Sequence, residues 1–171
     1  MADNLEFDPF SEASTLEFLE RVVRLSSAEQ TEALLEAGHY ALTRFAKNQI
    51  HQNMSSRNCE LSIRVIEGGG VGHATVNRFD EASLEQALDW ARQVARSGRV
   101  PAQPPDLPGP QQYRRIENRF EETARFAPGD RAEMARKLIE ASSSRGAEAA
   151  GAVSNSFEAT AIVNSRGLQA C

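Results

Sequence analysis

Apolar residues recur at helical spacing in three stretches of the chain. Within residues 11–25 and 81–97 they fall three or four positions apart, which places them on one face of a helix. Asp80 precedes the second stretch as a capping residue, and Pro128 opens the third, which ends in a serine-rich run before Gly146. The pattern predicts three amphipathic helices. The candidate caps of the first are Asp8, Ser11 and Ser14.

The period changes to two between Tyr40 and Asn77, which is typical of antiparallel strands with one buried face. Residues 31–37 also favour a strand, because Gly38 would end a helix there after only two turns. We expect a meander of four or five strands in this region. The predicted turns are Lys47-Asn48, Ser56-Arg57-Asn58 and Gly68-Gly69-Gly70.

The strongest break in the pattern is the segment 100–110, which holds five of the seven prolines. Proline neither continues a helix nor donates to a strand ladder, so we expect a stiff extended linker and a domain boundary here. After the third helix, residues 147–156 and 157–164 read as two strands. A turn at 164–167 then leads into another strand that begins at Leu168.

These elements predict an α+β fold: an antiparallel meander covered by helices, a Pro-rich linker, and the start of a second α+β unit. The expected domains are residues 1–99 and 112–171, with the linker at 100–111. The last strand stops at Cys171 without a partner, and an unpaired strand is an exposed edge. We therefore expect the sequence to continue in a longer protein.

Composition narrows the function classes. The formal net charge is −5, so no overall positive field exists to hold nucleic acid or an anionic membrane. No apolar run approaches the roughly 20 residues that span a bilayer, and the N-terminus is acidic, unlike a secretory signal. We therefore expect a cytoplasmic protein. With 40% hydrophobic residues, the chain can bury one good core or two small ones.

The residues that carry catalysis in other proteins are isolated in this sequence. His39, His51 and His73 lack a second ligand at metal spacing, and a lone imidazole is usually structural. Cys59 and Cys171 form no CxxC pair, and we interpret Cys59 as a small buried hydrophobe. The glycine-rich run at 68–72 lacks the Lys-Ser/Thr of a phosphate loop, and GxSxG is absent. We predict neither catalytic nor metal-binding residues in this chain.

The most unusual segment is 42–53, which gathers many hydrogen-bonding side chains around a tight turn. Two interpretations stay open on chemistry alone. A polar strand face of this kind binds extended peptides in some proteins, and in many others it only faces water.

The same segment, Leu42-Thr-Arg-Phe-Ala-x-Asn-x-Ile-His-Gln-Asn53, resembles a hallmark of the TldD/PmbA family. Members of this family are proposed modulators of DNA gyrase and are regarded as metallopeptidases. The likeness covers nearly the whole chain from about Thr31, whereas full-length members are much longer. It also includes Ile63-Arg-Val65, Gly72-His-Ala-Thr-Val76, the helix Leu84–Ala91 and the turn Asn164–Leu168.

The resemblance implies a peptide-processing assembly in which two chains enclose a cavity, and in which zinc activates water. Catalytic members carry HExxxH further along, and this chain has none. Related PmbA-type subunits lack the motif and act as partners of catalytic ones. We therefore expect no cofactor in this chain, zinc in a full-length catalytic member, and no peptidase activity of this polypeptide alone.

The expected function is to shape the substrate cavity of a TldD/PmbA-type zinc metallopeptidase, a hydrolase, and to contact its partner subunit. Substrates would be peptides or unfolded proteins, and the partner a homodimeric or heterodimeric TldD/PmbA-type subunit. Neither nucleic acid nor membrane is an expected direct partner. The alternatives are a module that modulates DNA gyrase, the non-metal partner subunit of such a peptidase, and a free-standing ligand-binding domain. The expected contact residues are Arg44, Asn48, His51 and Gln52.

Overall fold

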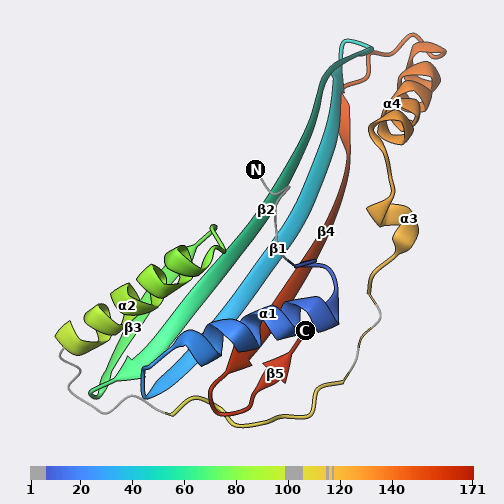
Figure 1. The fold of residues 1–171 in the computed structure, drawn as a ribbon. Coiled ribbons are helices and arrows are strands. Elements are labelled where there is room, and N and C mark those ends of the chain that lie inside the picture. Colours follow the sequence, from blue (N-terminus) through green and yellow to red (C-terminus); the bar gives the residue numbers. More distant parts are fainter. Residues whose placement is uncertain (1–6, 99–105, 115, 117) are drawn as a thin grey trace. The chain divides into compact units, whose positions relative to one another are not determined.

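The computed structural model describes residues 7–98, 106–114, 116 and 118–171. Part of the expected linker, residues 100–105, lies outside them. Figure 1 shows the order of the helices and strands along the chain. They are α1 (Glu12–Leu25), β1 (Gln30–Ala46), β2 (Gln49–Glu67), β3 (Gly70–Val76), α2 (Glu81–Ser97), α3 (Glu121–Ala124), α4 (Pro128–Ser143), β4 (Gly151–Asn164) and β5 (Gln169–Ala170).

The chain divides into two compact units, which we describe separately. Unit 1 comprises Met1–Ala37, Asn58–Arg115 and Ala159–Cys171, and unit 2 comprises Gly38–Arg57 and Ile116–Glu158. The strands β1, β2 and β4 contribute residues to both units. The units are thus interleaved along the sequence, and the domain boundary expected at 100–111 stays a prediction.

The five strands form one sheet in the order β3-β2-β1-β4-β5, with antiparallel pairing of β2 with β3 and of β4 with β5. Two tight turns need positive φ. Lys47 and Asn48 have φ of 52° and 58° between β1 and β2, and Gly68 and Gly69 have φ of 59° and 76° between β2 and β3. Successive residues with positive φ match the right-handed twist of a two-residue hairpin.

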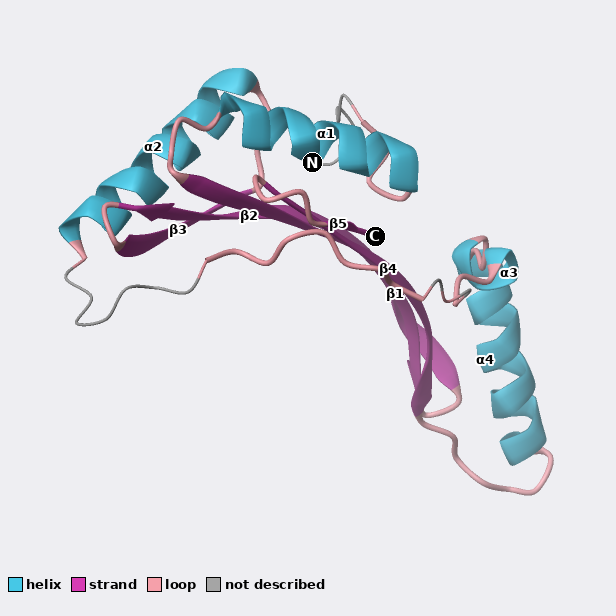
Figure 2. Cartoon of the chain, turned by 90° about the horizontal axis from the view of Figure 1, so that it is seen from below, coloured by secondary structure: helices cyan, strands magenta, loops and turns pink. Residues whose placement is uncertain are grey.

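The core of unit 1 lies between the sheet and two helices, α1 and α2, which cover the same face in Figure 2. Alternate residues of the strands point into this core, as the period of two requires. Full burial of each Leu, Ile or Val side chain contributes about 1.5–3 kcal/mol. The core side chains include Leu19 and Val22 of α1, Ala33 and Leu35 of β1, Leu61, Ile63 and Val65 of β2, Leu84 and Leu88 of α2, and Val163 of β4.

Cys59 belongs to this core and is 8% exposed. Burial raises the pKa of its thiol to about 11, because the thiolate would lose its hydration. The thiol therefore stays protonated near neutral pH. The interpretation of Cys59 as a small buried hydrophobe is confirmed.

Unit 2 consists of the ends of β1 and β2 that form their hairpin, part of β4, and the helices α3 and α4. The inner side of α4 is short of apolar residues, and its buried residues are Arg131 and Ala135. The apolar side chains of Met134 and Leu138 are 48% and 49% exposed. Unit 2 is therefore built around polar as well as apolar contacts.

The predicted α+β class with an antiparallel sheet is confirmed, as are the three long helices, the strand over residues 31–37 and the Lys47-Asn48 turn. Asp80 caps α2 as expected, since its side chain accepts a hydrogen bond from the Ser83 N–H at 3.0 Å. The turn at Asn164 is also confirmed. Its side chain accepts hydrogen bonds from two backbone N–H groups, those of Arg166 and Leu168.

Two strand predictions are wrong. The turn expected at residues 56–58 lies inside β2, so the meander has three strands and not four or five. Residues 151–164 form the single strand β4, where two strands were expected. In both places hydrogen bonding to a neighbouring strand outweighs the local turn preference of Ser, Asn and Arg. The short helix α3 was not predicted.

None of the helices in the described residues is long and apolar enough to cross a bilayer.

The contact between α2 and β3 depends on two glycines, which lead to our first prediction. A Cβ at Gly72 would lie 1.8 Å from the Ala91 carbonyl oxygen, and one at Gly70 would lie 1.9 Å from that of Ala95. Backbone atoms cannot yield, so we expect Gly72→Ala to lower the free energy of unfolding by about 3 kcal/mol or more. Urea unfolding followed by circular dichroism measures this loss.

Gly109→Ala is the matched control, because a Cβ there meets no atom within 4 Å. Its unfolding free energy should change by less than about 0.5 kcal/mol. Equal stability of the two variants would show that α2 does not pack this closely on β3.

Candidate functional site

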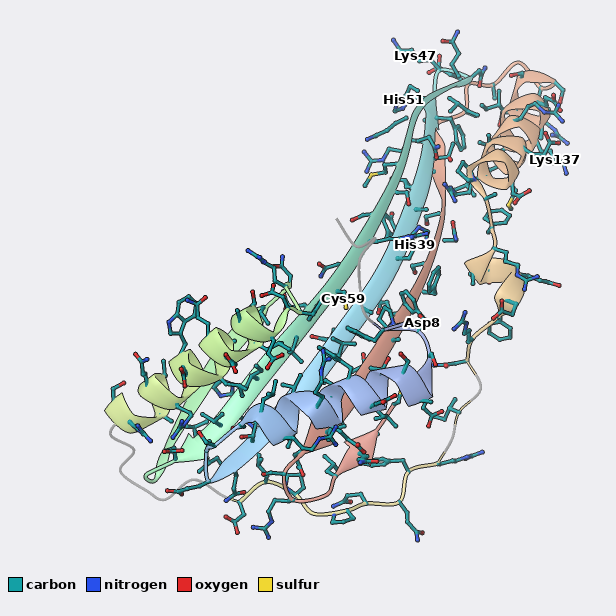
Figure 3. All side chains as sticks on the ribbon, in the orientation of Figure 1. Asp8, His39, Lys47, His51, Cys59 and Lys137 are labelled. Carbon is teal, nitrogen blue, oxygen red and sulfur yellow. The ribbon has the colours of Figure 1, made fainter. Side chains whose placement is uncertain are left out.

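The candidate site is the hairpin in unit 2 that β1 and β2 form, which we call the 38–57 hairpin. Every residue from Gln49 to Asn58 is exposed, although all of them belong to a regular strand. Figure 3 shows Lys47 at the hairpin tip and His51 close to it on β2. The exposed run contrasts with the remainder of β2, where buried and partly buried residues alternate.

The outer edge of β2 is open along this run. The neighbours of β2 in the sheet are β1 and β3, and β3 pairs only with residues 61–67. Among the described residues, no strand lies beside residues 49–60 on that side. Outward-directed N–H and C=O groups on this edge are therefore available to another extended chain.

Arg44, His51 and Gln52 are exposed on this hairpin and form no hydrogen bond or ion pair with described residues. Arg44 belongs to β1, and His51 and Gln52 belong to β2, the neighbouring strand in the sheet. They are free to contact a ligand, and their assignment as contact residues stays a prediction.

Asn48 differs from the other three expected contact residues because its amide is already engaged. Its Oδ1 accepts a hydrogen bond from the Ala149 N–H at 2.7 Å, and its Nδ2 lies 3.4 Å from the Ala147 carbonyl oxygen. Its own N–H donates to the Ala149 carbonyl at 3.3 Å. Asn48 thus ties the hairpin turn to the segment before β4, and this contact uses the groups that a ligand would need.

Unit 2 also contains a buried arginine that sequence reasoning missed. The side chain of Arg131 is 1% exposed and has only neutral oxygens as hydrogen-bond partners among the described residues. Nη1 lies 3.0 Å from the Phe126 carbonyl and 2.9 Å from Asn155 Oδ1, and Nη2 lies 3.3 Å from Asn53 Oδ1. Nε is buried and has no hydrogen-bond partner within the described part of the chain.

The asparagines around Arg131 are themselves held by further hydrogen bonds. Thr43 donates its hydroxyl to Asn53 Oδ1 at 3.0 Å, and Asn155 donates to the Thr123 carbonyl at 3.0 Å. Residues of β1, β2, β4 and α4 therefore meet in one polar network, in which Thr43, Arg131 and Asn155 are buried and Asn53 is exposed. It fixes the inner face of the hairpin and leaves the exposed residues on it in a defined position.

His39 lies on β1 in the same unit, with Nε2 2.9 Å from Ser55 Oγ and its ring 5.0 Å from the Phe157 ring. Its Nδ1 is buried and finds no hydrogen-bond partner in the residues that the structure describes. Burial lowers the pKa of His39, and the positive charges of Arg57 and Arg131 lower it further. The neutral imidazole is the stable form in the folded protein.

The described ranges contain no group of three His, Cys, Asp or Glu side chains that could hold a metal ion. The zinc that the resemblance implies for a catalytic member therefore does not fit these residues. Of the three histidines, His39 and His51 belong to unit 2 and His73 belongs to unit 1.

Comparison with solved structures shows that other proteins share this α+β fold. TldE from Thermococcus kodakarensis matches with a TM-score of 0.75 and 21% identity, over 92% of this chain and 35% of that chain. A proposed modulator of a DNA gyrase from Thermotoga maritima matches with a TM-score of 0.75 and 16% identity, over 90% of this chain and 36% of that chain. Another proposed modulator of DNA gyrase, from Bacteroides thetaiotaomicron, matches with a TM-score of 0.75 and 13% identity, over 94% of this chain and 38% of that chain.

Residues 31–95 match the family model described as PmbA/TldA metallopeptidase domain 1. The resemblance to this family seen in the sequence is thus confirmed over these residues. The chain spans little more than a third of the length of the three solved structures. No curated protein matches it significantly.

Our second prediction concerns the Arg131 network. Replacing Arg131 by Met leaves the buried oxygen of Asn155 without its donor, and a buried unsatisfied group costs about 1–3 kcal/mol. We expect Arg131→Met to lower the free energy of unfolding by about 2 kcal/mol, measured in urea. Arg136→Met on the exposed side of α4 should cost much less, because its ion pairs are solvated. Equal losses would contradict a structural role of the network.

Our third prediction concerns pH. The folded protein lowers the pKa of His39, so the unfolded state binds the proton more readily and stability falls as the pH drops below about 6.5. His39→Gln should reduce the fall in the urea midpoint between pH 7.5 and pH 5.5. His51→Gln, at an exposed position, should keep the wild-type slope. An unchanged slope in His39→Gln would show that His39 is not held in its neutral form.

Proposed function

We propose that the chain forms a non-catalytic wall of a TldD/PmbA-type zinc metallopeptidase, shaping its substrate cavity and contacting its partner subunit. The match of residues 31–95 to domain 1 of PmbA/TldA metallopeptidases carries this proposal. The substrates would be peptides or unfolded proteins, and the assembly would act in the cytoplasm. Zinc in such an assembly would be held by other residues, because the described ones offer no ligand set.

The open edge of β2 supports a role in holding an extended chain. Peptides that add a strand to a sheet gain affinity from main-chain hydrogen bonds, and side chains beside the edge add further contacts. Arg44, His51 and Gln52 have the exposure for such contacts. Asn48 would support them indirectly by fixing the turn through Ala149.

A second candidate function is the modulation of DNA gyrase, which the names of the Thermotoga maritima and Bacteroides thetaiotaomicron proteins suggest. A pull-down with purified gyrase, compared with one on beads carrying an unstructured peptide, separates the two functions. Retention by gyrase and not by the peptide would favour this second candidate.

Our fourth prediction tests the peptidase proposal in the full-length protein. Arg44→Ala combined with His51→Ala removes two exposed hydrogen-bonding groups, and a hydrogen bond to a charged group contributes about 1.5–3 kcal/mol. We expect about 10-fold weaker binding of a fluorescent unstructured peptide, measured by anisotropy, or a weaker dimer in sedimentation velocity.

The matched control is Arg114→Ala, another exposed arginine without an ion pair in the described residues, located in unit 1. It should leave peptide affinity and assembly unchanged. If the Arg44 and His51 variant also retains both, the hairpin does not contribute to the substrate cavity.

A further inference from the structure

The 38–57 hairpin carries positive charge without negative charge. Residues 38–57 include Arg44, Lys47 and Arg57 and contain no Asp or Glu, although the whole chain has a net charge of −5. None of these three cations forms an ion pair with a described residue, and all three are exposed.

Elsewhere, most of the described cations have a carboxylate within ion-pair distance. Both helix surfaces and sheet positions show this pairing, in unit 1 and in unit 2. The paired cations are Arg24, Arg64, Arg78, Arg92, Arg96, Arg119, Arg125, Arg136, Lys137 and Arg166. The hairpin is therefore the place where cations gather without internal partners and beside an open strand edge.

The cations lie on both faces of the hairpin. Thr43 bonds to Asn53 and His39 bonds to Ser55, so these four side chains share one face of the hairpin. Since side chains alternate along a strand, Arg57 lies on the face of Ser55 and Arg44 lies on the opposite one. An extended chain that paired with β2 would meet a positive charge on either face.

The edge itself lacks the features that natural sheets use to prevent strand addition. Residues 49–58 contain neither proline nor lysine, and their one charged residue is Arg57. Ile50 and Met54 add partly exposed apolar surface, at 42% and 38% exposure. The run of ten residues is long enough for a full strand.

A second copy of the chain is a poor occupant of this edge. Pairing of two identical hairpins would bring Arg44, Lys47 and Arg57 of one copy close to the same cations of the other, and like charges across a strand pair are destabilising. Negative charge on the incoming strand would instead complement these cations.

We propose that the outer edge of β2 at Gln49–Asn58 binds an extended peptide segment rich in Asp and Glu. Main-chain hydrogen bonds to β2 hold the segment, and Arg44, Lys47 and Arg57 select acidic over neutral sequences. This inference rests on the proposed function and adds the substrate class to it.

Two fluorescent ten-residue peptides test the selection on the complete 171-residue chain. One has four Glu, two on each face of an extended strand, and Thr elsewhere, and the other has Gln in place of every Glu. A solvated ion pair contributes about 1.4- to 5-fold in affinity, so three cations should give the Glu peptide roughly a 10-fold advantage in anisotropy titrations. The advantage should shrink between 0.05 and 0.5 M salt, because salt screens exposed charges.

The variant Arg44→Gln with Arg57→Gln should reduce the advantage to about 2-fold or less. The control Arg24→Gln with Arg114→Gln makes the same change in net charge in unit 1 and should keep it. Circular dichroism shows whether each variant folds. If the double variant does not fold, Lys47→Gln or Arg57→Gln alone replaces it, and each should reduce the advantage by a smaller factor.

Equal binding of the Glu and Gln peptides overturns the charge selection and leaves peptide binding by the hairpin in place. An advantage that survives Arg44→Gln with Arg57→Gln, or that disappears in the unit 1 control, also overturns the inference. Failure of both peptides to bind contradicts the proposed role of the hairpin as well.

Discussion

The pairing of β1 with β2 is the interaction on which both units depend. The two strands have 17 and 19 residues and are joined by the two-residue turn Lys47-Asn48, whose residues have positive φ values. In unit 1 their pairing places Leu35 and Leu61 in the core beneath α1 and α2. A slip of either strand by one residue would turn its core side chains toward solvent, so the core specifies the pairing.

The two ends of the strands serve different purposes. In unit 1 the buried face is apolar, and glycines allow α2 to lie against β3 at backbone distance. In unit 2 the buried face includes the guanidinium of Arg131, whose hydrogen bonds to Asn53 and Asn155 replace apolar packing. An inner face held by hydrogen bonds leaves the outer edge of β2 exposed without loss of order, which suits a surface that binds another chain.

Local patterns in the sequence were sufficient for the helices, for the Asp80 cap and for the unusual polarity of residues 42–53. They failed where distant residues decide the outcome. Ser56 to Asn58 looks like a turn, yet pairing with β1 keeps it extended. Arg131 looks like one more surface charge on an amphipathic helix, and it is buried by residues that lie 24 and 78 positions away.

The open edge of β2 could not be predicted either, because which strand edge stays unpaired depends on where the other strands of the sheet lie. Candidate contact residues could be chosen by residue type, but the sequence does not show whether their side chains are free to contact a ligand. Asn48 shows the difference: it has the right chemistry for a ligand contact, and its amide is bonded to residues 147 and 149. The cationic character of the hairpin becomes meaningful only when the pairing of the other cations with carboxylates is known.

Amide hydrogen exchange on the complete chain, with and without the glutamate-rich peptide, is the most direct test of the central claim that β2 accepts an extended partner. Strand addition predicts new protection of alternate amides within residues 49–58, because only every second N–H points to the open edge. It also predicts little change in α1 and α2. Protection confined to the helices, or none within residues 49–58 at saturating peptide, would contradict the account.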